Sequence, residues 1–184
     1  MVLLESQMKL KTGDSAPDFE LKGIDDKNHK LDDYQGYKGY LVIFMCNHCP
    51  YVKAKVGSLN ELYEKFGKDI AIIGINSNDS TDYPEDSFEA MKETAKEKGF
   101  QFDYLVDDSQ NIAKKYGAMC TPDPFLFNQD KKLVFHGRID NSMKPDDPIT
   151  EKTMILNIEK MISGTKIEKD FDPSIGCSIK WKEN

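Results

Sequence analysis

The sequence predicts an α/β fold in which helices flank a central mixed β-sheet. Two apolar runs of strand length, residues 40–45 and 70–75, enclose a segment with the three-and-four spacing of an amphipathic helix. This strand–helix–strand order favours parallel pairing through a crossover. Residues 124–127 and 132–135 flank a polar turn and indicate an antiparallel hairpin. Parallel and antiparallel pairs together make the sheet mixed.

Length and charge limit the classes of protein to which the chain can belong. The 184 residues are predicted to form one domain, 1–184, with a core at about 12–163 and a C-terminal extension at 164–184. No apolar run approaches the roughly 18 residues of a membrane span. A net charge of −7 with one arginine, Arg138, argues against nucleic acid as a partner. Without a leader-like N-terminus, the protein is expected to be cytoplasmic and without a membrane partner.

The first half of the chain is expected to begin with an N-terminal β-hairpin. Its strands are predicted near residues 19–21 and 28–31, on either side of a polar turn. The uninterrupted apolar run 40–45 is typical of a central strand that is buried on both faces. The following helix is predicted to begin after Pro50 and to end at Gly67, before the second buried strand.

The second half alternates shorter helices and strands. Residues 165–184 show no clear period and are assigned no element, and the acidic loop 79–86 is expected to be solvated surface. The predicted elements are a helix over 84–99, a strand over 102–106, a short helix that Asp108 or Ser109 caps and that ends near Gly117, and a final helix that Thr150 caps.

The most informative motif is Cys46-Asn47-His48-Cys49, between the first buried strand and its helix. In thiol–disulfide exchange, one thiol must be exposed and ionised, and a second must lie close enough to resolve the mixed disulfide. Free amides and the dipole at a helix start stabilise a thiolate. We therefore predict that Cys46 is the nucleophile and that Cys49, about one turn inside the helix, is the resolving thiol.

Histidine next to the pair has two interpretations. As an N–H donor or imidazolium, His48 would lower the thiolate pKa further and make the dithiol more oxidising. The alternative is a solvent-facing turn residue. The other two histidines, His29 and His136, lie on predicted hairpins and are expected to be structural.

Several segments together resemble the thioredoxin-like superfamily, most closely its peroxiredoxin-like branch of the alkyl hydroperoxide reductase and thiol-specific antioxidant (AhpC/TSA) type. They are the opening 13–19, the strand–dithiol–helix unit, Thr121-Pro122 before a hairpin, and the terminal helix. The resemblance implies a thioredoxin-like fold and an antioxidant or redox-homeostasis role. It also implies that Pro122 is cis beside the dithiol and that the Thr121 backbone helps to bind substrate. Residues 175–181 resemble the tails of uncharacterised members.

The chain departs from the peroxiredoxin pattern P-x-x-x-[TS]-x-x-C. Counted back from Cys49, the hydroxyl and proline positions hold Cys46 and Val42; counted back from Cys46, they hold Ile43 and Gly39. Efficient peroxidase chemistry is therefore not expected. The strand before the dithiol also contains no carboxylate, so the sequence identifies no proton path for the second half of the reaction.

Two further cysteines are candidates for additional redox thiols. Cys120 stands two residues before Pro122 and is expected near the dithiol, although buried cysteines often only pack. Cys177 in the tail could pair with Cys46 or Cys120. Four cysteines could also bind zinc or an iron–sulfur cluster, but the irregular spacing argues against it. We expect no metal and no cofactor.

The leading prediction is an enzyme, a thiol-disulfide oxidoreductase. Cys46 attacks the disulfide of a protein or small molecule, Cys49 releases the product, and an external thiol reductant restores the dithiol. The alternatives are a thiol peroxidase in which one cysteine forms a sulfenic acid, and a redox-sensing binding module that reports oxidation to a partner.

Overall fold

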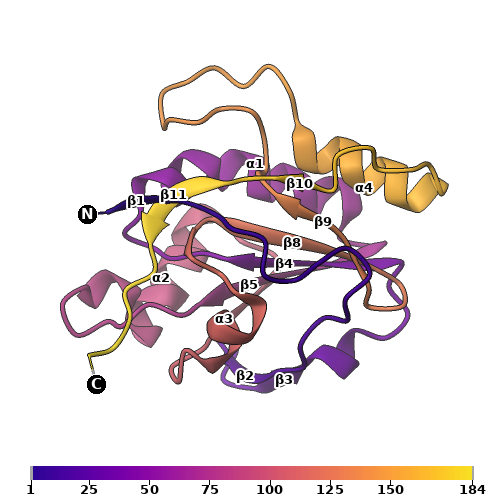
Figure 1. Cartoon of the computed structure of the whole chain (residues 1–184). Coiled ribbons are helices and arrows are strands. Elements are labelled where there is room, and N and C mark those ends of the chain that lie inside the picture. The colour runs from indigo at the N-terminus through magenta and orange to yellow at the C-terminus, as the bar shows by residue number, and fades with distance from the viewer. Residues whose placement is uncertain (1, 184) are drawn as a thin grey trace.

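The computed structural model describes residues 2–183, and its centre is an eight-stranded mixed sheet with helices on both faces (Figure 1). The strand order in this sheet is β10-β9-β8-β4-β5-β6-β2-β3. The α/β class is confirmed. The strands of the large sheet are β2 (Glu20–Gly23), β3 (Asn28–Lys30), β4 (Gly39–Phe44), β5 (Ile70–Asn76), β6 (Asp103–Val106), β8 (Asp123–Asn128), β9 (Leu133–Gly137) and β10 (Phe171–Asp172).

The centre of the sheet follows the predicted topology. β4 pairs in parallel with β5 and antiparallel with β8, and β5 pairs in parallel with β6. Every residue of β4 and β5 is buried, as a continuous apolar run requires of a strand covered on both faces. The two predicted hairpins, β2–β3 and β8–β9, are both present.

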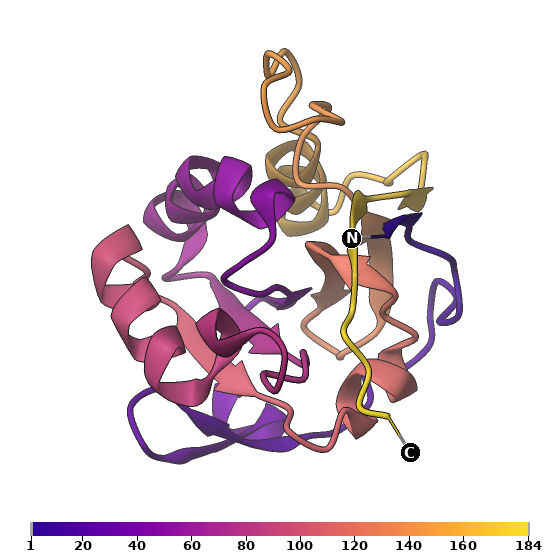
Figure 2. The ribbon, with the colours of Figure 1, turned by 90° about the vertical axis from the view of Figure 1, so that its left-hand side faces the viewer.

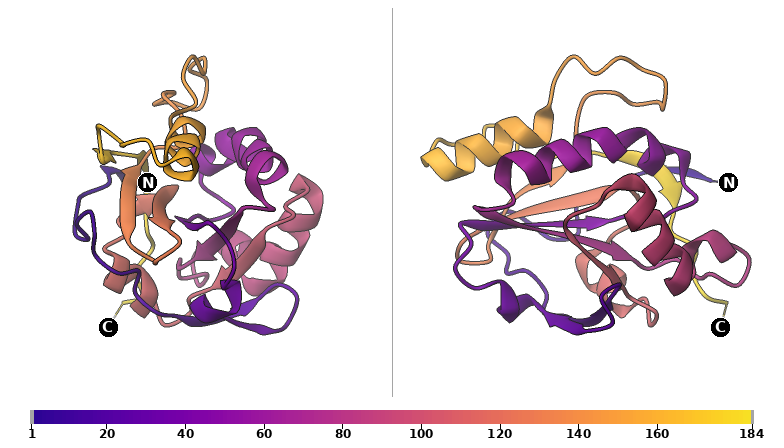
Figure 3. Two further views of the ribbon diagram at one scale, coloured as in Figure 1. Left: turned by 90° about the vertical axis from the view of Figure 1, so that its right-hand side faces the viewer. Right: turned by 180° about the vertical axis from the view of Figure 1, so that it is seen from behind.

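The two faces of the sheet carry separate apolar clusters. One face is covered by α1 (Pro50–Phe66), α2 (Phe88–Lys98) and α4 (Thr153–Ser163). Figure 3 shows α4 lying alongside α1 above the sheet. The other face is covered by α3 (Asn111–Tyr116) and by the segment that includes the β2–β3 hairpin. Among the described residues, no helix has both the length and the apolar character needed to cross a membrane.

The C-terminal extension forms strands, contrary to the expectation of no element for residues 165–184. β11 (Ile175–Ser178) lies between β1 (Leu3–Glu5) and β7 (Cys120–Thr121) in a second, three-stranded sheet, and β10 adds to the edge of the large one. Figure 2 shows the tail, in yellow, passing from the α1 side of the molecule to the α3 side. Strands of two to four residues are too short to display a period of two, which explains why the sequence pattern missed them.

Two of three predicted helix starts are displaced. At α3, Ser109, one of the two predicted caps, accepts from Asn111 N at 3.2 Å, and Asp107 also accepts from Ile112 N and Ala113 N. The first turn predicted at Pro84 is a separate 3-10 turn, η2 (Pro84–Asp86), and α2 begins after Ser87. Thr150 does not cap α4, which begins at Thr153. Its side chain instead accepts from Asn141, because a long-range partner competes with the local cap.

Candidate active site

The dithiol lies in the turn between β4 and α1. Cys49 is the N-cap of α1 and Pro50 is its first residue, where a missing N–H costs no hydrogen bond. The prediction that Cys49 lies one turn inside the helix is therefore wrong. The expectation of an exposed thiol is also wrong, because Cys46 and Cys49 are only 1% and 0% exposed.

The residue before the cis proline contacts both sulfurs. The Thr121–Pro122 bond is cis, as the resemblance implied. The Thr121 hydroxyl lies 3.3 Å from Cys46 Sγ, and the Thr121 carbonyl oxygen lies 3.2 Å from Cys49 Sγ. The Thr121 backbone, which was predicted to bind substrate, is paired with Cys177 of β11 in this structure. The chain's own tail thus covers that edge.

A third cysteine touches the dithiol from the tail. Cys177 Sγ lies 2.8 Å from Cys49 Sγ, so the contact is to Cys49 rather than to the predicted partners Cys46 or Cys120. The contact of Cys120 Sγ is with the Pro122 carbonyl, at 3.9 Å. All four thiols are buried. Cys49 is therefore the sulfur on which the cluster converges.

The charge in this cluster rests on Cys49. An S–H donor from Cys46 lowers the pKa of Cys49 to about 5 despite burial, and Cys177 and the Val52 N–H act in the same direction. Burial raises the pKa of Cys46. The hydrogen bond of its thiol to Cys49 and the charge of Asp86 raise it further. The prediction placed the thiolate on Cys46 in the resting state. The N-cap position of Cys49 explains the difference, since the free helix amides lie nearest to it.

His48 is turned towards a buried carboxylate. Its Nδ1 lies 2.5 Å from Asp86 Oδ2, and its ring stacks on Tyr83 with the centroids 4.5 Å apart. Asp86 also accepts from Asn47 N at 2.7 Å and from Asn78 Nδ2 at 2.7 Å. Burial acts to raise the pKa of Asp86, but these hydrogen bonds outweigh it and the pKa is lowered. The solvent-facing interpretation of His48 is wrong, because its side chain is 7% exposed.

Asp86 is the functional residue that sequence reasoning missed. The loop 79–86 was expected to be solvated surface, yet the Asp86 side chain is 0% exposed. The turn η2 directs it inwards, beneath the loop that carries Asn47 and His48. No local signal distinguishes this carboxylate from its acidic neighbours, since Asn47 and His48 stand 39 and 38 positions earlier in the chain.

Cys46, His48 and Asp86 form one constellation. The Cys46 sulfur, a ring nitrogen of His48 and a carboxylate oxygen of Asp86 lie within 4.8 Å of one another. Among the described residues, His48 Nε2 is buried and has no hydrogen-bond partner. With Nδ1–H donating to Asp86, Nε2 is the basic nitrogen. Nucleophile, base and orienting carboxylate are the components of an activated thiol.

A metal ion fits the same residues less well. Ligands of tetrahedral zinc at 2.0–2.1 Å stand about 3.3 Å apart. The 2.5 Å between His48 Nδ1 and Asp86 Oδ2 is the separation of a hydrogen-bonded pair. This geometry favours acid–base chemistry over metal binding.

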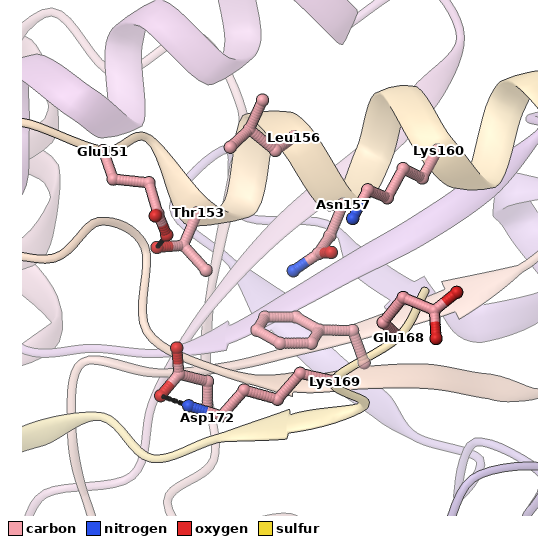
Figure 4. Close-up of a pocket in the computed structure, with 9 residues that line it drawn as sticks. Glu151, Thr153, Leu156, Asn157, Lys160, Glu168, Lys169 and Asp172 are labelled. Carbon is pink, nitrogen blue, oxygen red and sulfur yellow. Dashed lines mark hydrogen bonds and ion pairs between the residues drawn. The ribbon is translucent and has the colours of Figure 1, made fainter. Parts of the chain in front are cut away.

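Of two cavities, one borders the dithiol and the other does not. A small one of about 10 Å³ is bordered by Cys46 and Asn47, by α1, and by Phe100 beyond α2. A larger one of about 200 Å³ lies beneath α4, lined by charged residues such as Glu151 and Lys169, with no cysteine or histidine (Figure 4). The cavity beside Cys46 belongs to the redox site.

The model of the AhpC/TSA family matches residues 12–136. Thiol-disulfide oxidoreductase ResA of Bacillus thuringiensis subsp. konkukian is 30% identical over 127 residues, which are 68% of this chain and 69% of that protein.

Two solved structures bear on the fold. An uncharacterized conserved protein from Geobacillus kaustophilus superposes with a TM-score of 0.94 at 39% identity, covering 100% of this chain and 98% of that one. The thioredoxin domain of a thiol-disulfide oxidoreductase from Bacteroides vulgatus gives a TM-score of 0.60 at 20% identity, covering 70% of this chain and 89% of that one. These likenesses confirm the thioredoxin-like fold.

Proposed function

The chain belongs to the AhpC/TSA family and is a thiol-disulfide oxidoreductase, and on that premise we propose that Cys46 and Cys49 are its redox pair. The observation that carries the proposal is the position of the pair, because both sulfurs contact Thr121 beside the cis proline. The S–H donor from Cys46 also lowers the pKa of Cys49. A dithiol with one preformed thiolate is prepared for exchange.

In the first step, Cys46 is the nucleophile. A ring nitrogen of His48, which lies within 4.8 Å of Cys46 Sγ, takes the proton of the Cys46 thiol, and Asp86 stabilises the imidazolium that forms. The Cys46 thiolate attacks one sulfur of the substrate disulfide, which breaks that bond and forms a mixed disulfide. The first product leaves as a thiolate and takes the proton back from His48. His48 and Asp86 thus supply the proton path that the sequence did not identify.

In the second step, Cys49 resolves the mixed disulfide. Its thiolate attacks Cys46 Sγ, forms the Cys46–Cys49 disulfide and expels the second product thiolate. The preformed charge on Cys49 means that this step needs no further base. An external thiol reductant then restores the dithiol. The substrate is proposed to be a protein or small-molecule disulfide, and nucleic acid and membranes are not proposed as partners.

We propose an antioxidant role as a second function, which is supported by the family and by one contact. The Thr121 hydroxyl at 3.3 Å from Cys46 Sγ supplies the hydroxyl that the sequence motif lacks. Peroxiredoxins also use an arginine that polarises the peroxide, but the one arginine of this chain, Arg138, is paired with Asp172 at 2.8 Å. Peroxide consumption should therefore be slow compared with disulfide reduction.

The proposed location is the cytoplasm. The proposed cycle needs a thiol reductant to restore the dithiol, and the cytoplasm keeps thiols reduced. Fractionation of cells, with thiol alkylation before lysis, tests this proposal. Protein found outside the cytoplasm with its dithiol oxidised would overturn it.

The decisive test of function compares purified variants in dithiol-dependent insulin reduction and in peroxide consumption. Cys46→Ser should abolish insulin reduction, and Cys49→Ser should trap mixed disulfides on Cys46. Cys120→Ser is the matched control, since its thiol is equally buried but bonds to a backbone carbonyl. If Cys46→Ser keeps full activity in both assays, the proposed pair is wrong and a redox-sensing module becomes the better description.

A further inference from the structure

We propose that Cys177 is a third redox residue, which replaces Cys46 as the partner of Cys49, so that the oxidised protein stores its disulfide as Cys49–Cys177. This inference rests on the proposed function, because Cys46 must first deliver oxidation to Cys49. It adds a tail-borne thiol to the reaction and changes which cysteine is left reduced afterwards.

The sulfurs of Cys49 and Cys177 are already in contact. Cys49 Sγ and Cys177 Sγ lie 2.8 Å apart although the residues are separated by 128 positions. A disulfide bond is 2.03–2.05 Å long, so less than 1 Å of approach separates contact from bond. Cys49 also takes an S–H bond from Cys46. The Cys49 sulfur can therefore form a disulfide with either Cys46 or Cys177.

The backbone around Cys177 is held in place on both sides of β11. In the pairing of β11 with β7, Cys177 stands opposite Thr121, the residue that contacts both dithiol sulfurs. A Cβ on Gly176 would lie 2.0 Å from the Thr121 carbonyl oxygen, so only glycine permits this approach. Ser178 N donates to Val2 O at 2.9 Å and thus holds β11 from its other side.

Cys120 differs from Cys177 in what its thiol contacts. This cysteine is also buried and lies next to Thr121, but its thiol contacts the Pro122 carbonyl at 3.9 Å. Proximity to the cis proline alone therefore does not bring a thiol onto Cys49. Cys120 serves as the internal control for every variant of Cys177.

The proposed transfer conserves atoms and electrons. Cys177 loses its proton, and its thiolate attacks Cys49 Sγ in the Cys46–Cys49 disulfide. The Cys49–Cys177 bond forms, the Cys46–Cys49 bond breaks, and the Cys46 sulfur leaves with the electron pair and takes the proton. The step is an isomerisation of one disulfide, so it requires no oxidant or reductant.

The charges around Cys177 determine when its thiol can lose its proton and attack. Burial raises the pKa of Cys177 to about 12, and the neighbouring Cys49 thiolate adds to this effect. When Cys49 enters a disulfide its charge disappears, so the Cys177 proton is released more readily. Lys180 acts in the same direction by favouring a thiolate on Cys177. Cys177 is therefore protonated in the reduced protein and activated by oxidation.

The experiment maps the disulfide formed in one turnover. Reduced wild type, Cys177→Ser and Cys120→Ser receive one equivalent of a small aromatic disulfide, are quenched in acid and alkylated, and are digested without reduction for mass spectrometry. Wild type and Cys120→Ser should contain Cys49–Cys177 with Cys46 alkylated. Cys177→Ser should contain Cys46–Cys49 instead.

The outcomes separate this inference from the proposed function. A Cys46–Cys49 disulfide with alkylated Cys177 in the wild type overturns the third thiol and leaves the redox pair intact. A Cys46→Ser variant that releases as much product thiol as wild type overturns the redox pair itself. The wild-type map decides the question even if Cys177→Ser is poorly folded.

Discussion

Asp86 is a buried carboxylate whose four hydrogen bonds hold the dithiol turn and His48 in place. Its partners are the Asn47 and His48 backbone amides, the Asn78 amide and the His48 ring. Burial opposes its ionisation, but these donors keep it charged. The charge in turn fixes the His48 tautomer and favours the imidazolium formed during attack. Asp86 is thus a positioning residue for the base.

Asp86→Asn is expected to slow insulin reduction by on the order of 100-fold, because general-base assistance of this size depends on His48. Glu85→Gln is the matched control, since its side chain is exposed one position earlier. Rescue distinguishes positioning from simple loss of structure: Asp86→Glu keeps a carboxylate and should restore part of the rate, whereas Asp86→Asn should not. An unchanged rate in Asp86→Asn would count against the role of the dyad.

The charge on Cys49 should be visible in the acid range. Folding lowers the pKa of Cys49 from 9.0 to about 5. The thiolate therefore contributes its full stabilisation above about pH 9, and this contribution is lost as the pH falls through 5. The ultraviolet absorbance of the thiolate in the reduced protein should appear with a midpoint near pH 5.

Two variants control this titration. Cys120→Ser should leave the midpoint where it is in the wild type. Cys49→Ser should move the first thiolate to higher pH, because burial and the charge of Asp86 raise the pKa of the remaining Cys46 thiol. A wild-type midpoint near 9 would contradict the assignment of the charge.

At the scale of elements, β11 depends on one glycine. Gly176→Ala places a Cβ 2.0 Å from the Thr121 carbonyl oxygen, a contact that the backbone must relieve by separating β11 from β7. We expect a loss of about 1–3 kcal/mol in the free energy of unfolding. Faster amide exchange across residues 175–178 should accompany the loss.

Gly57→Ala in α1 is the control substitution. A Cβ there meets nothing within 4 Å, and alanine favours a helix interior. It should raise the free energy of unfolding by roughly 0.5–1 kcal/mol and leave exchange in β11 unchanged. If Gly176→Ala behaves like Gly57→Ala, the tail does not need the close approach.

A buried ion pair joins α1 to the segment after β9. The Lys55 ammonium donates to Asp140 and to the Ser142 carbonyl, the latter at 3.0 Å, and the Asp140 side chain is 1% exposed. Asp140→Asn leaves the Lys55 charge buried without a counter-charge, so about 3–5 kcal/mol of stability should be lost in urea denaturation. The exposed pair of Lys65 with Glu159 provides the comparison, and Glu159→Gln should cost less than about 1 kcal/mol. Equal effects of the two substitutions would refute a structural role for the buried pair.

At the scale of the whole molecule, the two disulfides open to Cys49 differ in what they constrain. Cys46–Cys49 closes a very small ring, whereas Cys49–Cys177 closes a loop that spans 128 positions. Loop-closure entropy predicts that the long loop stabilises the oxidised protein by up to roughly 5 kcal/mol. Oxidation should therefore raise the urea midpoint of wild type and Cys120→Ser much more than that of Cys177→Ser. Equal gains in all three proteins would contradict the tail disulfide.

The structure could be predicted from the sequence where the interacting residues are close together along the chain. β4, α1 and β5 were predicted almost to the residue, because the apolar spacing that produces them is local. The strands of the tail were missed, since each is short and acquires its order from a partner far away in the chain. Thr150 was predicted to cap α4, but its hydroxyl accepts a hydrogen bond from Asn141, nine positions earlier in the chain.

By itself, the sequence determined that a C-x-x-C dithiol stands between a buried strand and a helix, because neighbouring residues encode both elements. The resemblance carried by its motifs also indicated the cis proline. Only the tertiary structure decided that Asp86 is buried against His48, that Cys49 carries the charge, and that Cys177 lies on Cys49. The physical reason is that a pKa or a sulfur–sulfur contact depends on which groups are close in space, and folding brings these groups together from 38 to 128 positions apart.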